Sequence, residues 1–215
     1  MTWHKMMIQV ESVMDIPNWI HGLKAIIFDL DDTLYSEKEY VRSGYRAIAR
    51  MLPEVEEMEE KLWRAFEQNK PAIDKVLTAE GLYTDAVKQV CLSAYRTHQP
   101  DIHFFEGVTE LLLRLRTDGY MLGVITDGRP EGQRAKIKAL GLDALVDYII
   151  VTDELGGAEY RKPNSAAFVR MQEVFAVPFE QMCYVGDNLK KDFIAPEKLG
   201  MKCIYFRNAD GLYYV

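Results

Sequence analysis

Apolar residues recur in two different patterns along the chain, and these patterns divide it into two parts. Short continuous apolar runs, separated by amphipathic segments, occupy residues 21–35 and 105–215. Between them, residues 36–104 show apolar positions at helical spacing and no convincing strand. Short continuous runs are typical of parallel strands that are covered on both faces. The pattern predicts an α/β core interrupted by an all-helical insertion.

The apolar runs of the core predict its strands, which we expect at 23–28, 120–125, 147–151, 182–185 and 202–206. Segments with helical spacing lie between them, at 108–117, 130–140 and 164–175, and a further helix is expected before the last strand. Strands that alternate with helices form parallel sheets with right-handed crossovers. The fold class is therefore expected to be α/β, with a Rossmann-like parallel sheet and helices on both faces.

In the insertion, apolar side chains are spaced three and four residues apart, as in the run Val41, Tyr45, Ile48 and Leu52. Thr84 is placed to cap a helix, and Gly81 ends a shorter one. This spacing predicts a compact bundle of about four helices. Residues 1–20 follow neither pattern, contain Pro17 as a breaker, and are interpreted as an N-terminal extension.

Composition and charge narrow the classes of function. The chain has 215 residues, of which 48% are hydrophobic and 27% are charged, an ordinary globular mixture. Its net charge of −7 argues against nucleic-acid binding, because phosphate backbones are bound by clustered Lys and Arg. No apolar stretch approaches the ~20 residues of a membrane span, so no membrane partner is expected. A small phosphorylated ligand needs only a local positive pocket and is still permitted.

The cysteines indicate a reducing compartment. Cys91, Cys183 and Cys203 are too few and too scattered for a disulfide framework or a zinc site. Cys183 and Cys203 lie in apolar runs and are expected to be buried thiols. The first ten residues lack the basic start and continuous apolar segment of a signal peptide. We therefore expect a cytoplasmic protein.

Polar side chains follow the predicted strands at their carboxyl ends, where ligands of open parallel sheets bind. These side chains belong to Asp29, Asp31, Thr33, Thr126, Asp127, Lys162, Asp187 and Asp192. So many carboxylates in one place require a cation, and Mg²⁺ prefers hard oxygen ligands together with substrate phosphate. A metal ion, a lysine and a carboxylate able to attack phosphorus suit a phosphoryl group.

Four short motifs contain these residues, in the order FDLDDTL, ITDG, RKP and GDNLKKD. In this order they resemble the motifs of the haloacid dehalogenase superfamily, over the chain from about Leu23 to Phe206. The helical insertion is similar to the subgroup that has a four-helix cap, which would close over the core. The resemblance implies a phosphatase or a phosphomutase, because dehalogenases and phosphonatases lack a second acid such as Asp31.

The resemblance also implies a role for each catalytic residue. Asp29 is expected to be the nucleophile, and Asp31 the general acid and base. Thr126 is expected to bind the phosphoryl oxygens with help from the main chain of Asp127. Lys162 is expected to neutralise charge between the nucleophile and phosphate, although alone it could be a plain surface lysine.

The implied metal site would hold Mg²⁺ through the side chain of Asp29, the main-chain carbonyl of Asp31 and Asp187. Asp187 alone could be a helix cap, but the other motifs favour the metal role. Proline is tolerated in the first turn of a helix, so Pro196 predicts a helix that begins near Asp192. Asp192 is therefore expected close to Asp187, as a second ligand or as an acid behind the metal site.

Candidate substrate contacts lie close to the motifs in the sequence. Asp127, Gly128 and Arg129 follow Thr126, and Arg42 lies near the start of the first inserted helix. Arg42 and Arg129 are expected to bind a second anionic group of the substrate. By similarity to the family, the substrate is expected to be a nucleotide or a sugar phosphate.

Two alternative functions follow from the same residues. A phosphomutase would return the phosphoryl group to its sugar instead of releasing phosphate. A non-catalytic phospho-acceptor would resemble a response-regulator receiver, which also uses an aspartate at a strand end and Mg²⁺. Asp31 argues against the acceptor, because an adjacent hydrolytic base does not help a long-lived phospho-aspartate.

Overall fold

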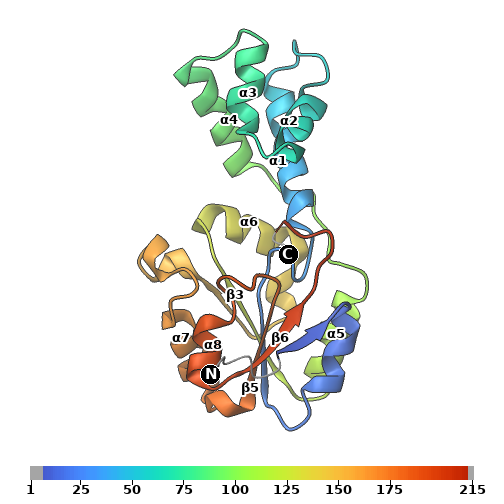
Figure 1. The fold of residues 1–215 in the computed structure, drawn as a ribbon, viewed down its shortest axis with the longest axis vertical. Coiled ribbons are helices and arrows are strands. Elements are labelled where there is room, and N and C mark those ends of the chain that lie inside the picture. The colour runs from blue at the N-terminus through green and yellow to red at the C-terminus, as the bar shows by residue number, and fades with distance from the viewer. Residues whose placement is uncertain (1–6, 213–215) are drawn as a thin grey trace, which may run out of the picture. The chain divides into compact units, whose positions relative to one another are not determined.

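The computed structural model describes residues 7–212, and the chain divides into two compact units (Figure 1). An α/β unit contains the chain up to Glu37 and from His103 onward, and a helical unit contains Lys38–Ile102. Over residues 7–212, no helix is long and apolar enough to cross a membrane.

A six-stranded sheet forms the centre of the α/β unit, and all neighbouring strands in it are parallel. In chain order its strands are β1 (Ile8–Val10), β2 (Ala25–Phe28), β3 (Met121–Thr126), β4 (Tyr148–Val151), β5 (Met182–Gly186) and β6 (Lys202–Phe206). The order across the sheet is β1-β6-β5-β2-β3-β4, so β2 lies between β5 and β3. The predicted parallel α/β core is confirmed, and its first motif follows a central strand.

Helices surround this sheet, as Figure 1 shows. They are α5 (Val108–Thr117), α6 (Pro130–Leu140), α7 (Ala166–Phe175) and α8 (Ile194–Leu199). Short 3₁₀ helices stand at Val13–Trp19 (η1), Leu142–Ala144 (η2), Thr152–Leu155 (η3), Ala158–Tyr160 (η4) and Phe179–Gln181 (η5). Because alternate side chains of a strand point to opposite faces, Ile27 packs with α7 and α8 while Phe28 points to the other face.

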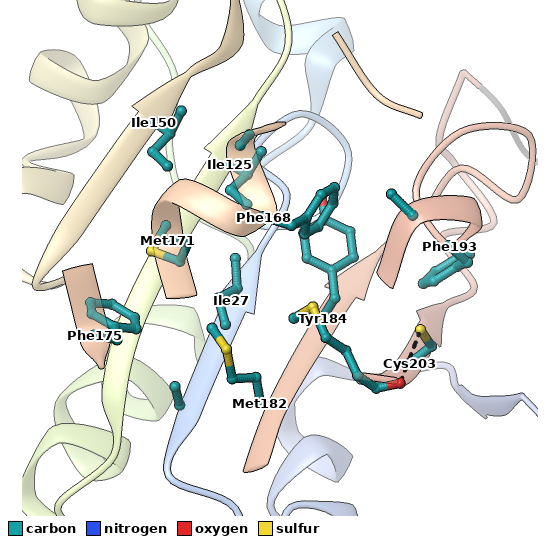
Figure 2. Close-up of a cluster of buried hydrophobic side chains, with 14 of the residues drawn as sticks. Ile27, Ile125, Ile150, Phe168, Met171, Phe175, Met182, Tyr184, Phe193 and Cys203 are labelled. Atoms are coloured by element: carbon teal, nitrogen blue, oxygen red, sulfur yellow. Dashed lines mark hydrogen bonds between the residues drawn. The ribbon is translucent and has the colours of Figure 1, made fainter. Parts of the chain in front are cut away.

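Figure 2 shows the buried cluster between the sheet and helices α7 and α8. Ile27, Ile125 and the ring of Tyr184 contribute to it from β2, β3 and β5. The Tyr184 ring meets Phe168 edge-on at a centroid distance of 5.0 Å, and Phe193 at 6.3 Å. Such pairs have a preferred geometry, so this packing orients the Tyr184 ring within the core.

The N-terminal segment adds an edge strand that the apolar pattern does not predict. Strand β1 pairs with β6, with Ile8 opposite Ile204 and Val10 opposite Phe206. Residues 8–20 are thus part of the α/β unit and not an extension to it, while residues 1–6 lie outside the described part of the chain. Only Val10 of this short strand is buried, so too few alternating positions exist to indicate a strand.

The helical unit contains the expected four helices, α1 (Glu37–Met51), α2 (Met58–Glu67), α3 (Ala72–Ala79) and α4 (Asp85–Thr97). Helix α1 begins at Glu37, one residue before the first residue of this unit. Thr84 caps α4, because its side-chain oxygen accepts a hydrogen bond from the Val87 N–H at 3.1 Å. Apolar side chains at the predicted spacing fill the interior, among them Val41, Ile48 and Leu62. The cysteines of the chain are buried and unpaired, as expected for Cys183 and Cys203.

Gly44 tests the packing of the helical unit, because alanine inside a helix normally adds about 0.5–1 kcal/mol of stability over glycine. At this position a Cβ would lie 2.4 Å from Cδ2 and 3.3 Å from Cγ of Tyr95, so the ring would have to move. We predict that Gly44→Ala instead lowers the free energy of unfolding by about 1–3 kcal/mol in chemical denaturation. Adding Tyr95→Leu should recover part of the loss, and a more stable Gly44→Ala protein would contradict this packing.

Candidate active site

The candidate site begins where strand β2 ends. The register places Phe28 opposite Val124 of β3 and Val185 of β5. The next residue continues the ladder, because the Asp29 N–H donates to the Val185 carbonyl at 2.8 Å. Asp29 is only 3% exposed, so its carboxylate is held at the carboxyl end of the sheet by ordinary strand pairing.

The carboxylates that follow β5 lie beside Asp29. A Cβ on Gly186 would lie 2.6 Å from Oδ2 of Asp192, so this close approach requires glycine. The same oxygen accepts a hydrogen bond from the Asn188 N–H at 2.9 Å. One oxygen each of Asp29, Asp187 and Asp192 lies within 4.8 Å of the others. The structure thus brings together the three side chains that the sequence predicts near the metal.

The ammonium group of Lys162 lies among these carboxylates. Its Nζ is 2.7 Å from Oδ1 of Asp29, 2.8 Å from Oδ1 of Asp192 and 2.8 Å from the hydroxyl oxygen of Tyr184. An ammonium has three donors, and here three oxygen atoms lie within 2.8 Å of it. Burial alone would lower the pKa of Lys162, but Asp192 and Asp29 hold it well above its usual value.

One buried ammonium does not balance three buried carboxylates. Burial and the nearby charges of Asp29 and Asp192 raise the pKa of Asp187 to about 9. Burial also raises the pKa of Asp29 to about 6, although Lys162 opposes this shift. Hard oxygen ligands with excess negative charge are what divalent cations such as Mg²⁺ bind. The donor set therefore fits a divalent metal ion.

A cavity of about 330 Å³ in the α/β unit is bordered by these groups. Among the described residues its lining consists of Asp29, Asp31, Glu37, Asp127, Arg161, Lys162, Asp187, Asn188 and Lys191. Asp192 and Thr126 are fully buried and do not line it. Carboxylates outnumber cations in this lining, so the cavity suits a phosphoryl group only when a metal ion supplies further positive charge.

Asp31 lines the cavity but is bound by groups from another element. Its Oδ1 is 2.7 Å from Nζ of Lys136, and its Oδ2 accepts from Nε2 of Gln133 at 2.9 Å; both partners lie on α6. The Tyr35 hydroxyl also donates to Oδ1. Burial alone would raise the pKa of Asp31, but Lys136 and these hydrogen bonds hold it below the ordinary value.

Asp32 shapes the turn that carries Asp31. Its backbone is left-handed, with φ of 54°, and its side chain is fully buried. Oδ1 accepts from the Glu37 N–H at 2.9 Å, and Oδ2 accepts from the Leu212 N–H at 2.7 Å. These bonds allow the chain to turn directly after β2 while Asp31 remains at the cavity wall.

The second motif lies at the end of β3. Thr126 accepts a hydrogen bond from the Gln133 side chain, and Gly128 packs against the same side chain with φ of 139°. Asp127 accepts from the Lys162 N–H at 3.0 Å and pairs with Lys191 at 3.1 Å. Protein groups thus bind both carboxylate oxygens of Asp127, and its contact with substrate stays a prediction.

The two arginines predicted to contact substrate differ in their surroundings. Arg42 belongs to the helical unit, where its Nε lies 2.9 Å from Oε1 of Glu59, and it also pairs with Glu60. The Arg42 guanidinium lies 5.0 Å from the ring centroid of Trp63. Arg129 is exposed and directly precedes α6. The substrate roles of both arginines stay predictions.

Several residues of the site are missed by the motif analysis, namely Glu37, Gln133, Lys136, Tyr184 and Lys191. Gln133 and Lys136 are three residues apart and share a helix face, so two polar side chains on the inner face of α6 were a usable signal. Lys191 lies inside the motif GDNLKKD itself. Tyr184 had no such signal, because an aromatic residue in a buried strand is ordinary.

Comparison with known proteins assigns the family. The family model described as haloacid dehalogenase-like hydrolase matches residues 26–206. The chain belongs to this family. A glyceraldehyde 3-phosphate phosphatase of Pyrococcus furiosus is 30% identical to it over 199 residues, which cover 86% of this chain and 81% of that protein.

Solved structures of the family share the fold. A hydrolase of the superfamily from Geobacter sulfurreducens aligns with a TM-score of 0.64 at 19% identity, over 85% of this chain and 86% of that one. A magnesium-bound hydrolase of the family from Bacillus subtilis aligns with a TM-score of 0.61 at 20% identity, over the same shares. The family and the fold expected from the motifs are confirmed.

Repulsion among the buried carboxylates of Asp29, Asp187 and Asp192 yields a stability prediction. The raised pKa of Asp187 means that the metal-free folded protein binds this proton more tightly than the unfolded chain, so stability falls as pH rises from 3.8 towards about 9. Asp187→Asn cannot ionise at this position, so the stability of the variant should not fall with pH for this reason. We predict that, in EDTA at pH 7, the variant melts at a higher temperature than the wild type, by a margin that grows with pH.

Millimolar Mg²⁺ should reverse this order, because binding to the folded state raises the melting temperature of the wild type more than that of the variant. Asp143→Asn, an exposed substitution in the same unit, is the matched control and should leave both melting curves unchanged. A metal-free Asp187→Asn protein that melts below the wild type would contradict the proposed repulsion.

Proposed function

We propose that the protein is a Mg²⁺-dependent phosphatase that hydrolyses a small phosphorylated metabolite through a phospho-aspartate at Asp29. The observation that carries this proposal is the Asp29 carboxylate at the wall of the cavity, paired with Lys162 at 2.7 Å and next to Asp187. The similarity to a glyceraldehyde 3-phosphate phosphatase supports it independently.

Asp29 attacks phosphorus and the bond from phosphorus to the ester oxygen breaks, while Lys162 neutralises charge on the phosphoryl oxygens. The negative charge of bound substrate opposes Lys136 and raises the pKa of Asp31, so Asp31 takes up a proton from solvent when substrate binds and gives it to the leaving oxygen. Asp31 then takes a proton from the water that hydrolyses the phospho-aspartate. The side chains of Asp29 and Asp187 and the Asp31 carbonyl would hold Mg²⁺, which supplies positive charge to the phosphoryl group.

Asp192 acts indirectly in this proposal. Its Oδ1 pairs with Lys162 and its Oδ2 accepts from the Asn188 N–H, and the side chain does not line the cavity. Asp192 therefore holds Lys162 and the loop of the fourth motif in place, as the acid behind the metal site rather than a ligand in it.

The polar cavity suits a short phosphorylated metabolite, since charged groups predominate in its lining. A nucleotide or a sugar phosphate, a cap role for the helical unit and a cytoplasmic location stay predictions. The buried, unpaired thiols are consistent with that location.

A screen of phosphorylated metabolites with Mg²⁺, with release of inorganic phosphate as the readout, tests the proposal. Phosphate release that EDTA abolishes and Mg²⁺ restores is expected. An isomeric sugar phosphate without phosphate release would instead identify a phosphomutase. A phospho-Asp29 that persists in intact mass spectra would identify a phospho-acceptor, and either result would overturn the proposal.

The nucleophile is tested by Asp29→Asn, which keeps the shape of the side chain but removes the attacking anion. We expect turnover to fall to background while circular dichroism remains that of the wild type. Asp143→Asn, which makes the same change at an exposed position, should keep full activity. More than a few per cent of wild-type turnover in Asp29→Asn, with deamidation excluded by mass spectrometry, would rule out this nucleophile.

The acid and base role is tested by Asp31→Asn, which leaves the main-chain carbonyl available to the metal. We expect turnover of an alkyl phosphate to fall by ~10²–10⁴-fold, the usual contribution of positioned proton transfer. An aryl phosphate with a good leaving group should form phospho-Asp29 nearly as fast as in the wild type, measured as a burst. Equal losses of burst rate for good and poor leaving groups would contradict the role.

A further inference from the structure

Helix α6 carries two polar side chains on its buried face. Gln133 and Lys136 are each 4% exposed, although both residue types are usually found at the surface. The burial of an ammonium is costly unless a close opposite charge compensates for it. The carboxylate of Asp31, 2.7 Å from Nζ of Lys136, supplies such a charge.

The contacts of these two side chains converge on one carboxylate. Lys136 binds Oδ1 of Asp31 and Gln133 binds Oδ2, so the two residues contact different oxygens. The same Gln133 amide nitrogen also donates to Oγ1 of Thr126, which connects the ends of β2 and β3. Helix α6 therefore holds the side chains of the first and second motifs relative to each other.

Gln133 and Lys136 do not line the cavity, so they are not placed to contact substrate. Asp31 lines the cavity and its side chain is 17% exposed, whereas neither Gln133 nor Lys136 is among the described lining residues. They reach the carboxylate from within the protein and leave its cavity side accessible. Such an arrangement restrains a catalytic group without touching the ligand.

We propose that Gln133 and Lys136 are positioning residues that hold the Asp31 carboxylate in the orientation for proton transfer at the leaving oxygen. This inference rests on the acid and base role of Asp31 in the proposed function. A carboxylate turns about two single bonds, and proton transfer requires an oxygen within hydrogen-bond distance of the reacting atom. Misplacement of a catalytic group by about 1 Å costs ~10²-fold in rate.

The test is a double-mutant cycle on phosphate release from an alkyl phosphate. We expect Lys136→Met to lower kcat by ~10–100-fold with KM within about threefold of the wild type, because substrate does not touch this residue. Lys136→Arg keeps a positive charge and should retain more activity than Lys136→Met. Lys138→Met, an exposed lysine on the same helix, is the matched control and should behave as the wild type.

In the Asp31→Asn background, Lys136→Met should have almost no further effect on kcat, because the group that it positions is already lost. Gln133→Leu provides a second variant that leaves the ion pair intact, and we expect it to lower kcat as well. Because Gln133 also bonds Thr126, part of its loss should persist in the Asp31→Asn background, so additivity is judged on Lys136→Met. Burst formation of phospho-Asp29 from an aryl phosphate should stay close to the wild-type rate in both variants.

Additive losses in the cycle, or a loss carried by KM alone, would overturn the positioning role while the phosphatase activity stands. Loss of the aryl phosphate burst together with a changed circular dichroism spectrum in both variants would show a structural role instead, which also overturns it. Absence of phosphate release from every ester by the wild type would overturn the proposed function and this inference with it.

Discussion

The arrangement of the site depends on the buried ammonium of Lys162. It pairs with Asp29 and Asp192 and donates to the Tyr184 hydroxyl, so one cation joins groups from three parts of the chain. Without it, the carboxylates of Asp29 and Asp192 would lie buried together without their nearest positive charge, which is costly. Because Tyr184 also packs against Phe168 in the core, the hydrophobic packing of the sheet extends directly to the charged site.

A second constraint follows from the sheet itself. Strand β2 is central, and its pairing with β5 brings Asp29 beside the loop that carries Asp187. Strand pairing therefore brings together more negative charge than Lys162 neutralises. This excess, together with burial, raises the pKa of Asp187. A proton on Asp187 or a cation beside it would lower this repulsion. In this way the fold itself favours the binding of a cation at these carboxylates.

The site residues that could be predicted from the sequence are those whose chemistry is local to a motif. Asp29 follows a short apolar run, and the sheet geometry alone places such a residue at the ligand-binding edge. Strand β1 could not be predicted, because three residues with one buried side chain show no usable periodicity. Nor could Lys136 be predicted, because its partner Asp31 is 105 positions away in the chain and close only after folding. Gln133 lies 102 positions from Asp31, so the sequence could indicate its helix face but not this contact.

The sequence by itself determined five of the six strands, the main helices, the break between the α/β and helical parts, and the four motifs at the strand ends. These features depend on the periodicity of apolar residues and on the order of neighbouring residues, both of which are visible in the sequence. Only the tertiary structure decided that Asp192 binds Lys162 behind the cavity and that α6 holds Asp31. Such pairings depend on distances between side chains far apart in the chain, and those distances exist only once the sheet and its helices have packed.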